Sequence, residues 1–306
     1  MPQGKYMPEG LFDSQLMASY INSEAGMTKA METGAILQGT VTRCDSRHNL
    51  YCDVGAFKGI IPRNEAVFDI DSPSKEIAVI SRVGKPVCFK IIGFEKGLYI
   101  LSRRAAQKEA MEYFLANLSC GDILRGRVTH IEPFGVFVDI GCGNVSLIGI
   151  ENISVSRISS PHDRFRTGQE ILCAVKYIDR SMKRITMTHK ELLGTWRENV
   201  SRFNVGETVR GIIRGIEDYG IFVELAPNLS GLAEYKEGAA VGQEVSVYIK
   251  SIIPEKMKVK LLIIDTLEQK KRKLIDESDY YVRSGHMVSF RYSPPECTVK
   301  KAEIIF

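Results

Sequence analysis

Hydrophobic and polar residues alternate over much of the chain, and this period of two predicts a mainly β protein. The stretch GQEILCAVKYID, which begins at Gly168, shows the alternation clearly. Two segments change to the helical period, RRAAQKEAMEYFLANL after Ser102 and HKELLGTWRENVSRF after Thr188. Each of them places its large apolar residues on one helix face. We therefore expect small β domains that are joined by short helices.

The strand pattern recurs three times along the chain, each time after a glycine that predicts a turn. The first strands of the repeats read GAILQGTV, GDILRGRV and GETVRGII, from Gly34, Gly121 and Gly206. Later strands read GKPVCFKI, GQEILCAV and GQEVSVYI, from Gly84, Gly168 and Gly242. The second repeat also contains a polar stretch, SVSRISSPHDRFRT, that the third repeat lacks. Five strands with a variable insert after the third strand are typical of an OB-type barrel.

These patterns predict a mainly β fold of three tandem OB-fold barrels, each five-stranded, joined by short α-helical linkers. We expect an N-terminal helical segment at 1–33, barrels at 34–104, 120–190 and 205–264, linker helices at 105–119 and 191–204, and a C-terminal helix and β extension at 265–306. The extension should begin with a basic helix, LEQKKRKLIDE, and end in two strands around a proline turn. Helix caps are expected at Asp13 or Ser14, and as capping boxes at Thr188–Glu191 and Thr266–Gln269.

The composition fits a soluble globular protein, with 306 residues of which 44% are hydrophobic and 25% are charged. The net charge of +4 permits a polyanionic partner but does not demand one. The chain has no apolar run of about eighteen residues and no apolar signal core at its start. We therefore expect a cytoplasmic protein without a membrane partner.

The sequence gives no indication of metal, cofactor or catalysis. The seven cysteines show neither a Cys-x-x-Cys pair nor zinc-finger spacing, so we interpret them as reduced, structural residues. The chain lacks the Gly-x-x-x-x-Gly-Lys-Ser/Thr loop, the His-Glu-x-x-His motif and the Gly-x-Ser-x-Gly motif. His162 and Asp163 lie in the variable insert, which is a poor place for a catalytic pair. We predict that the protein is not an enzyme.

The most specific repeated stretch is EPFGVFVDIG, from Glu132 to Gly141, which returns as EDYGIFVELA, from Glu217 to Ala226. Each copy carries an aromatic residue, a glycine and a second aromatic residue within a strand pattern; the aromatic residues are Phe134 and Phe137, then Tyr219 and Phe222. A glycine that lets the chain bend would place both rings on one outer face. Two such rings form a stacking platform for unpaired bases. The alternative is that Phe137 and Phe222 are core residues.

The repeats resemble the S1 (S-one) RNA-binding domain, whose pattern is G-x-x-V-x-G-x-V, F-G-x-F-V-D, G-L-x-H-x-S and a basic residue before the closing strand. The second repeat matches through GDILRGRV, FGVFVDIG, GIENIS and KRITMT, and the third through GETVRGII, YGIFVEL, GLAE and MKVKLL. The first matches more loosely, through GAILQGTV, YCDVG, KGIIP and YILS. The chain is similar to the short, three-domain members of the ribosomal protein S1 family in low-GC Gram-positive bacteria.

The resemblance implies RNA-facing positions, which can be transferred residue by residue. The family histidine falls on Asn152 in the second repeat and on Glu234 in the third, so that Asn152 should bond a base edge and Glu234 should repel phosphate. The acid and base before the last strand fall on Asp179 and Arg184, and in the third repeat on Pro254 and Lys258. Arg184 and Lys258 could also be ordinary surface charges.

The first repeat departs from this pattern at several positions. His48 and Tyr51 stand in place of the two aromatic residues, and Asn49 replaces the bending glycine. Pro62 stands at the family histidine and Leu98 near the position of Arg184, which removes a phosphate contact and exposes apolar surface. We therefore expect the first barrel to contact a protein partner or the ribosome surface, although His48 and Tyr51 could still stack a base.

The resemblance implies a non-catalytic protein that binds single-stranded RNA and holds mRNA near the 30S ribosomal subunit for translation. The alternative is a regulator or scaffold in RNA decay or transcription, which uses its barrels to bind protein. Fold alone does not distinguish these functions, because barrels of this kind serve many.

Overall fold

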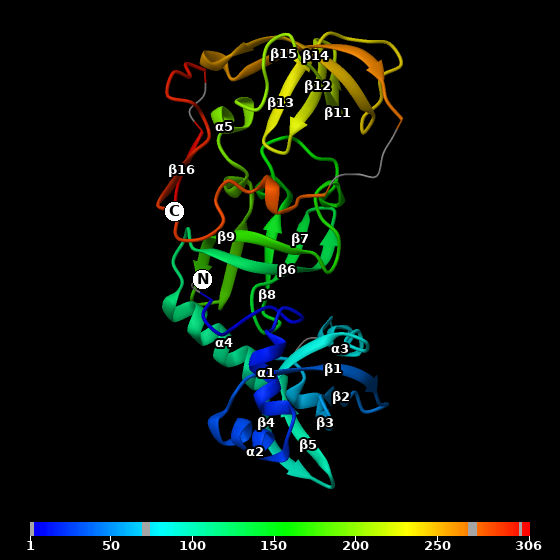
Figure 1. The fold of residues 1–306 in the computed structure, drawn as a ribbon, viewed down its shortest axis with the longest axis vertical. Helices are drawn as coiled ribbons and strands as arrows, with labels where there is room; N and C mark the ends of the chain where they lie inside the picture. The colour runs from blue at the N-terminus through cyan, green and yellow to red at the C-terminus, as the bar shows by residue number, and fades with distance from the viewer. Residues whose placement is uncertain (1–2, 69–73, 269–273, 300–301) are drawn as a thin grey trace.

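Three closed β-barrels of five strands each are stacked along the longest axis of the molecule (Figure 1). This arrangement comes from a computed structural model, which describes the chain except for residues 1–2, 69–73, 269–273 and 300–301. The expected fold class, a mainly β chain of OB-like barrels, is confirmed.

The first barrel contains β1 (Leu37–Cys44), β2 (Leu50–Val54), β3 (Phe57–Ile61), β4 (Pro86–Glu95) and β5 (Leu98–Ser102). The short helices η1 (Arg63–Glu65) and α3 (Ser74–Ile80) lie between β3 and β4. The strands follow the order β1-β2-β3-β5-β4 and close on themselves through β1 and β4. All pairs are antiparallel except β3 and β5, which run parallel.

The second and third barrels repeat this order of strands. The second contains β6 (Ile123–Glu132), β7 (Gly135–Asp139), β8 (Val145–Gly149), β9 (Glu170–Asp179) and β10 (Arg184–Thr188), with η2 (Ile150–Asn152) and η3 (Pro161–Asp163) after β8. The third contains β11 (Thr208–Glu217), β12 (Gly220–Ala226), β13 (Leu229–Ala233), β14 (Glu244–Ile253) and β15 (Lys258–Thr266), with η5 (Pro254–Lys256) before the last strand. In each barrel the alternate side chains that point inward form a hydrophobic core.

The N-terminal segment joins the first barrel to the second. Helices α1 (Ser14–Ile21) and α2 (Glu24–Thr33) lie at the first barrel, and the side chain of Asp13 caps α1. The residues before α1 extend to the second barrel, where the buried Gln3 amide donates to the backbone oxygens of Arg125 and Ile140 at 2.6 and 2.7 Å. The sequence pattern did not predict this contact, because a short non-helical segment shows no hydrophobic periodicity.

A buried ion pair lies where this segment meets both barrels. Arg103 donates to both carboxylate oxygens of Glu9, at 2.7 and 3.0 Å, and Arg82 donates to the same carboxylate at 3.1 Å. The backbone N–H of Glu9 donates to Asp139 of the second barrel at 2.7 Å. Burial alone would raise the pKa of Glu9, but the Arg103 and Arg82 guanidinium groups hold it below its usual range.

Helix α4 (Arg103–Asn117) links the first two barrels and also serves as part of the core. Its N-cap is Ser102, and its buried residues Ala106, Ala110 and Phe114 belong to the hydrophobic cluster of the second barrel. The first linker helix is therefore part of the core of the second barrel and not an exposed connection between two independent barrels.

The second linker differs from the single helix expected at 191–204. It forms the turn η4 (Lys190–Leu193) and the short helix α5 (Trp196–Val200), which are separated by Gly194 with φ of 82°. The capping box that starts α5 is Thr195–Glu198, whereas Thr188 and Glu191 only share a side-chain hydrogen bond. A left-handed glycine ends the first turn, because φ > 0 is incompatible with a continuing helix. Trp196 is buried in the core of the third barrel.

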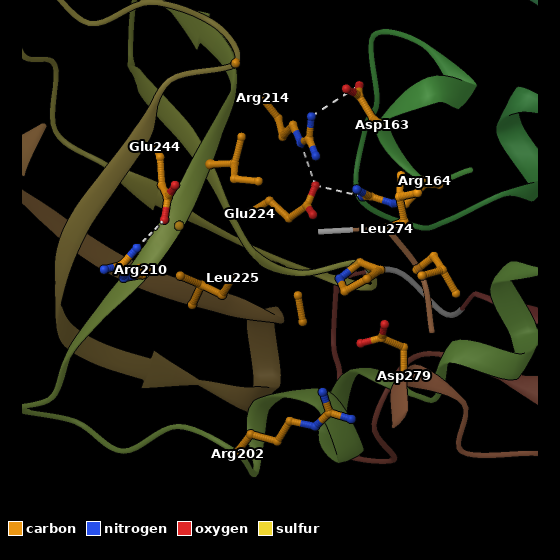
Figure 2. Close-up of a pocket in the computed structure, with 16 residues that line it drawn as sticks. Asp163, Arg164, Arg202, Arg210, Arg214, Glu224, Leu225, Glu244, Leu274 and Asp279 are labelled. Atoms are coloured by element: carbon orange, nitrogen blue, oxygen red, sulfur yellow. Dashed lines mark hydrogen bonds and ion pairs between the residues drawn. The ribbon is translucent and has the colours of Figure 1, made fainter. Parts of the chain in front are cut away.

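The second and third barrels meet at a buried network of four charged residues (Figure 2). Arg164 of the second barrel donates to Glu224 of the third at 2.7 Å, and Arg214 contacts both Glu224 at 2.6 Å and Asp163 at 3.2 Å. Asp163 and Arg164 come from the polar insert of the second barrel, so this insert takes part in the inter-barrel contact. This network borders a cavity of about 410 Å³.

The C-terminal extension runs back along the second and third barrels (Figure 1). In this extension the Tyr280 hydroxyl lies 3.0 Å from His189 Nε2, and the Tyr292 hydroxyl donates to the backbone oxygen of Asn228 at 2.6 Å. It ends in the antiparallel pair β16 (Ser289–Arg291) and β17 (Glu303–Ile305). The basic helix expected from Leu267, with the Thr266–Gln269 capping box, falls largely on residues 269–273, outside the described residues; the described parts on either side are not helical, apart from the start of η6 (Glu277–Asp279).

Candidate nucleic-acid interface

The two aromatic residues of the second barrel lie together at the β6–β7 hairpin. The rings of Phe134 and Phe137 stand edge to face, with centroids 6.1 Å apart. Phe134 is 56% exposed, and Phe137 is half-buried between the inward-facing Val136 and Val138. The alternative that Phe137 is a core residue does not fit this position, because its side chain points away from the core.

The third barrel repeats the arrangement. Tyr219 and Phe222 stand edge to face at 6.0 Å, and Tyr219 is 70% exposed. The glycine between them, Gly220, has φ of 147°, and a Cβ there would come within 2.5 Å of the backbone oxygen of Ala233. A glycine is thus required for close approach of the neighbouring strand as well as for the bend.

Strand register shows which residues share the outer face with these rings. Cross-strand partners point to the same side of a sheet, so a row of partners defines one face. In the second barrel the row is His130, Phe137, Leu147, Thr186 and Tyr177. In the third barrel it is Gly215, Phe222, Leu232, Lys260 and Ser251. Each second aromatic residue therefore has a strip of exposed or half-exposed side chains beside it.

The equivalent row of the first barrel is Arg43, Tyr51, Ile60, Ile100 and Gly93. Tyr51 occupies the position of Phe137 and Phe222, but the Arg43 guanidinium lies over its ring at 4.1 Å from the centroid. His48 is half-buried with φ of 61° in the turn before β2. Leu98, expected to expose apolar surface, is half-buried, and the more exposed apolar side chains of this barrel include Ile92 and Phe94.

Asn152 does not lie free at the surface, which corrects the expectation that it bonds a base edge. Its side chain is buried, its oxygen accepts from Lys176 Nζ at 2.9 Å, and its amide donates to Glu151 at 2.7 Å. Burial of the side chain therefore leaves its second N–H and its second lone pair little access to a base.

Asp179 and Arg184 are cross-strand partners on either side of the turn that joins β9 to β10. Asp179 accepts from the Ser181 hydroxyl at 2.6 Å and from the backbone N–H of Met182 at 2.9 Å, and these bonds lower its pKa. Asp179 therefore shapes the turn, and Arg184 remains exposed beside it. The structure places Arg184 where the sequence expected a basic residue before the closing strand.

In the third barrel Lys258 takes the position of Arg184, but its cross-strand partner is Ile253 rather than Pro254, which begins η5. Glu234, which was expected to repel phosphate, lies in an ion pair. Glu234 accepts from Lys250 Nζ at 2.8 Å, and this hydrogen bond and the lysine charge lower its pKa. The lysine therefore offsets part of the charge of this carboxylate, whose side chain is 70% exposed.

Sequence reasoning missed three lysines on this face, namely Lys176, Lys250 and Lys260. Lys176 and Lys250 stand at the same distance from the repeat glycines Gly168 and Gly242, so an alignment of the repeats on those glycines contains the signal. Lys260 follows Lys258 at the next outward position of β15, and it is exposed. The strand pattern did not distinguish these lysines, because a lysine at an outward strand position is usually an ordinary solvated residue.

The described part of the chain gives no alternative site of metal or membrane type. It contains no group of three or more His, Cys, Asp or Glu side chains that could hold a metal ion. Within the same residues, no helix has the length and apolar character needed to cross a membrane.

The chain is similar to curated ribosomal proteins over most of its length. It is 28% identical over 259 residues to small ribosomal subunit protein bS1 of Staphylococcus aureus (strain N315), which covers 79% of this chain and 64% of that protein. It is 28% identical over 255 residues to the small ribosomal subunit protein bS1 homolog of Bacillus subtilis (strain 168), which covers 80% of this chain and 63% of that protein. The chain thus spans less than two thirds of the length of these relatives.

Among solved structures, a multidomain protein with nucleic acid binding domains from Streptococcus pneumoniae covers 80% of this chain and 77% of its own, with 15% identity and a TM-score of 0.25. The family model of the S1 RNA binding domain matches residues 118–190, which include all strands of the second barrel. The resemblance expected from the sequence is confirmed: the second barrel matches the family model of the S1 RNA binding domain, and most of the chain is similar to ribosomal protein bS1.

Proposed function

We propose that the chain is a non-catalytic protein that binds single-stranded RNA through its second and third barrels and holds mRNA at the small ribosomal subunit. The observation that carries this proposal is the repeated pair of rings on the outer face, Phe134 with Phe137 and Tyr219 with Phe222, of which the first of each pair is exposed, beside basic side chains on the same face. The similarity to bS1 proteins supports the ribosomal setting.

The chemistry of the face favours unpaired nucleotides over duplex. An exposed ring can stack on the flat face of any unpaired base, and each such stack contributes about 1–3 kcal/mol. Bases in a duplex present only their edges, so the rings would have nothing to stack on. Arg184 and Lys258, both exposed at the end of the face, supply attraction to the phosphate backbone.

The contact between the second and third barrels supports joint binding. A buried ion network and the C-terminal extension hold the two barrels together, so one RNA strand that reaches both faces binds the second in an effectively intramolecular step. Linked sites of this kind reach effective concentrations of about millimolar. Two weak sites would then act as one stronger site.

The first barrel is assigned a different task, contact with a protein partner or the ribosome surface. Its aromatic position is covered by Arg43, and its face carries Ile60, Ile92 and Ile100 at positions where the other barrels carry polar or basic residues or leucine. This apolar face also favours the alternative function, a scaffold in RNA decay or transcription that binds protein.

The test of RNA binding is a titration of the full-length protein with unstructured RNA and with duplex of equal length, over a range of salt. Unstructured RNA should bind more tightly, and its log–log dependence on salt should have a slope near −0.7 per phosphate contacted. Equal affinity for duplex would contradict the stacking model.

The proposed association with the small ribosomal subunit is tested by gradient sedimentation of a native lysate with and without RNase. Migration with 30S particles supports the ribosomal proposal. Co-purification with nucleases that survives RNase supports the scaffold alternative instead.

A further inference from the structure

A β-bulge in the fourth strand of the second and third barrels projects one lysine from the RNA-facing side. In β9 the register with β10 passes from Tyr177 to Val175 and leaves Lys176 unpaired. In β14 the register with β15 passes from Ser251 to Ile249 and leaves Lys250 unpaired. A bulge re-aims the side chain of its extra residue, and both lysines are exposed.

The ammonium group of each bulge lysine is held by the residue near the end of the third strand. Lys176 donates to Asn152 at 2.9 Å, and Lys250 donates to Glu234 at 2.8 Å. An ammonium group has three N–H donors, so one anchoring bond leaves two for a ligand. Anchoring also lowers the rotamer entropy that a long side chain loses when it binds.

The first barrel lacks this feature although it has the same bulge. There the register passes from Gly93 to Ile91 and leaves Ile92 unpaired, and Pro62 stands near the end of the third strand. Two further outward positions also carry an apolar residue in the first barrel and a polar or basic residue in the other two. At the first position of the last strand the three barrels carry, in order, Leu98, Arg184 and Lys258, and at its third position Ile100, Thr186 and Lys260.

We propose that Lys176 and Lys250 are phosphate-binding residues that continue the strip of basic side chains across the RNA face, next to Arg184 in the second barrel and to Lys258 and Lys260 in the third. This inference rests on the proposed function and adds the path of the RNA backbone. The strand would run with its bases on the aromatic hairpin and its phosphates along the fourth and fifth strands. The first barrel, with three apolar residues at these positions, has no such path.

The two lysines have anchoring partners of different charge, so changes at the two sites should affect RNA binding differently. Lys176 is anchored by a neutral amide, and its charge also acts on the buried carboxyl of Glu191. Lys250 is anchored by the ionised Glu234, so a phosphate must compete with that carboxylate. Removing the carboxylate charge by Glu234→Gln should therefore strengthen RNA binding, and this effect should vanish when Lys250 is absent.

The experiment measures affinity of the full-length protein for unstructured RNA as a function of salt, for Lys176→Met, Lys250→Met, Glu234→Gln and the double variant of Glu234→Gln with Lys250→Met. Lys29→Met is the matched control, because Lys29 is exposed on α2 and has no ion pair among the described residues. Lys176→Met should weaken binding roughly tenfold, the size of one hydrogen bond to a charged group. It should also reduce the salt slope by about 0.7.

Lys250→Met should weaken RNA binding and reduce the salt slope by smaller amounts, and Lys29→Met should change neither. Affinity that falls while the salt slope stays constant would overturn the proposal, because the lysine would then act only by holding Asn152 or Glu234 in place. Thermal melts and the variant Lys176→Arg, which keeps the charge, separate such a structural role from a phosphate contact.

Phe137→Ala, measured in parallel, distinguishes failure of this inference from failure of the proposed function. Unchanged binding by the lysine variants together with weakened binding by Phe137→Ala would leave RNA stacking intact and overturn the phosphate path. No binding of unstructured RNA by the unmodified protein would overturn both.

Discussion

Arg164 in the insert of the second barrel donates to Glu224 in β12 of the third at 2.7 Å, and both side chains are almost completely buried. Glu224 also accepts from Arg214 at 2.6 Å, so one carboxylate bridges two guanidinium groups at the contact between barrels, and Asp163, 3.2 Å from Arg214, supplies the second negative charge. Such a pair contributes little net stability against a well-packed apolar contact, but it strongly resists loss of one partner. The relative placement of the two RNA faces therefore depends on Glu224.

Glu224→Gln should destabilise the contact between the second and third barrels. It leaves Arg164 buried without its carboxylate partner and Arg214 paired with Asp163 alone, and loss of one partner costs about 3–5 kcal/mol in comparable buried pairs. We expect a lower unfolding midpoint and weaker binding of an RNA long enough to reach both faces, with little change for an RNA that fits one face. Arg210→Gln serves as a control, because the Arg210–Glu244 pair lies at the exposed rim of the same cavity (Figure 2). An equal effect on long and short RNA would contradict a coupling role.

Phe134→Ala should weaken RNA binding without lowering stability. Its ring is 56% exposed, so its loss removes a base stack worth about 1–3 kcal/mol but leaves no buried cavity. Val136→Ala is the contrasting variant, because Val136 is fully buried and its loss should reduce stability by about 1–3 kcal/mol. Titration and thermal melting of both variants check the assignment. A Phe134→Ala protein that melts early and binds normally would place the ring in the core.

The proposed division of labour between barrels is tested in the full-length chain. Cutting between the first two barrels would remove α4, whose Phe114 lies in the core of the second barrel, and would separate Glu9 from its partners. Tyr51→Ala should leave RNA affinity nearly unchanged, whereas Phe137→Ala, at the equivalent position, should weaken it by about 1–3 kcal/mol. Comparable losses for the two variants would show that the first barrel binds RNA as well.

Two buried titratable groups should give opposing pH dependences of stability. Burial and the nearby Glu9 charge raise the pKa of Asp139 to about 7, so the folded state holds a proton that the unfolded state has lost, and stability falls as pH rises from about 4 to 7. Burial lowers the pKa of His189 to about 4, so the unfolded state binds the extra proton, and stability rises between about 4 and 6.5.

Asp139→Asn should therefore make the stability of the protein rise more steeply with pH between about 4.5 and 6.5 than it does in the unmodified chain. The variant also loses absolute stability, because Asp139 accepts from the backbone N–H groups of Glu9, Gly141 and Gly143 at 2.7, 2.8 and 3.0 Å. Urea unfolding across this pH range measures the slope, which is independent of that constant loss. The same slope in both proteins would mean that Asp139 does not titrate there.

The sequence by itself determined the fold of each barrel and the position of its aromatic pair. Strand alternation and turn glycines are local signals, and three copies in register made them specific. The placement of Phe134 three residues before Phe137, with a glycine between them, was enough to predict a shared outer face, because that result depends only on the hairpin.

Only the tertiary structure decided what surrounds those rings and how the barrels are joined. The partners of Asn152 and Glu234 are lysines from another strand, and cross-strand register is set by the bulge and by barrel closure rather than by local period. The contacts of Gln3 and Glu9 with the second barrel, and of Arg164 with Glu224, join segments far apart in the sequence. Such contacts have no period, because they arise from side chains that find their charge or hydrogen-bond partner only after the barrels have formed.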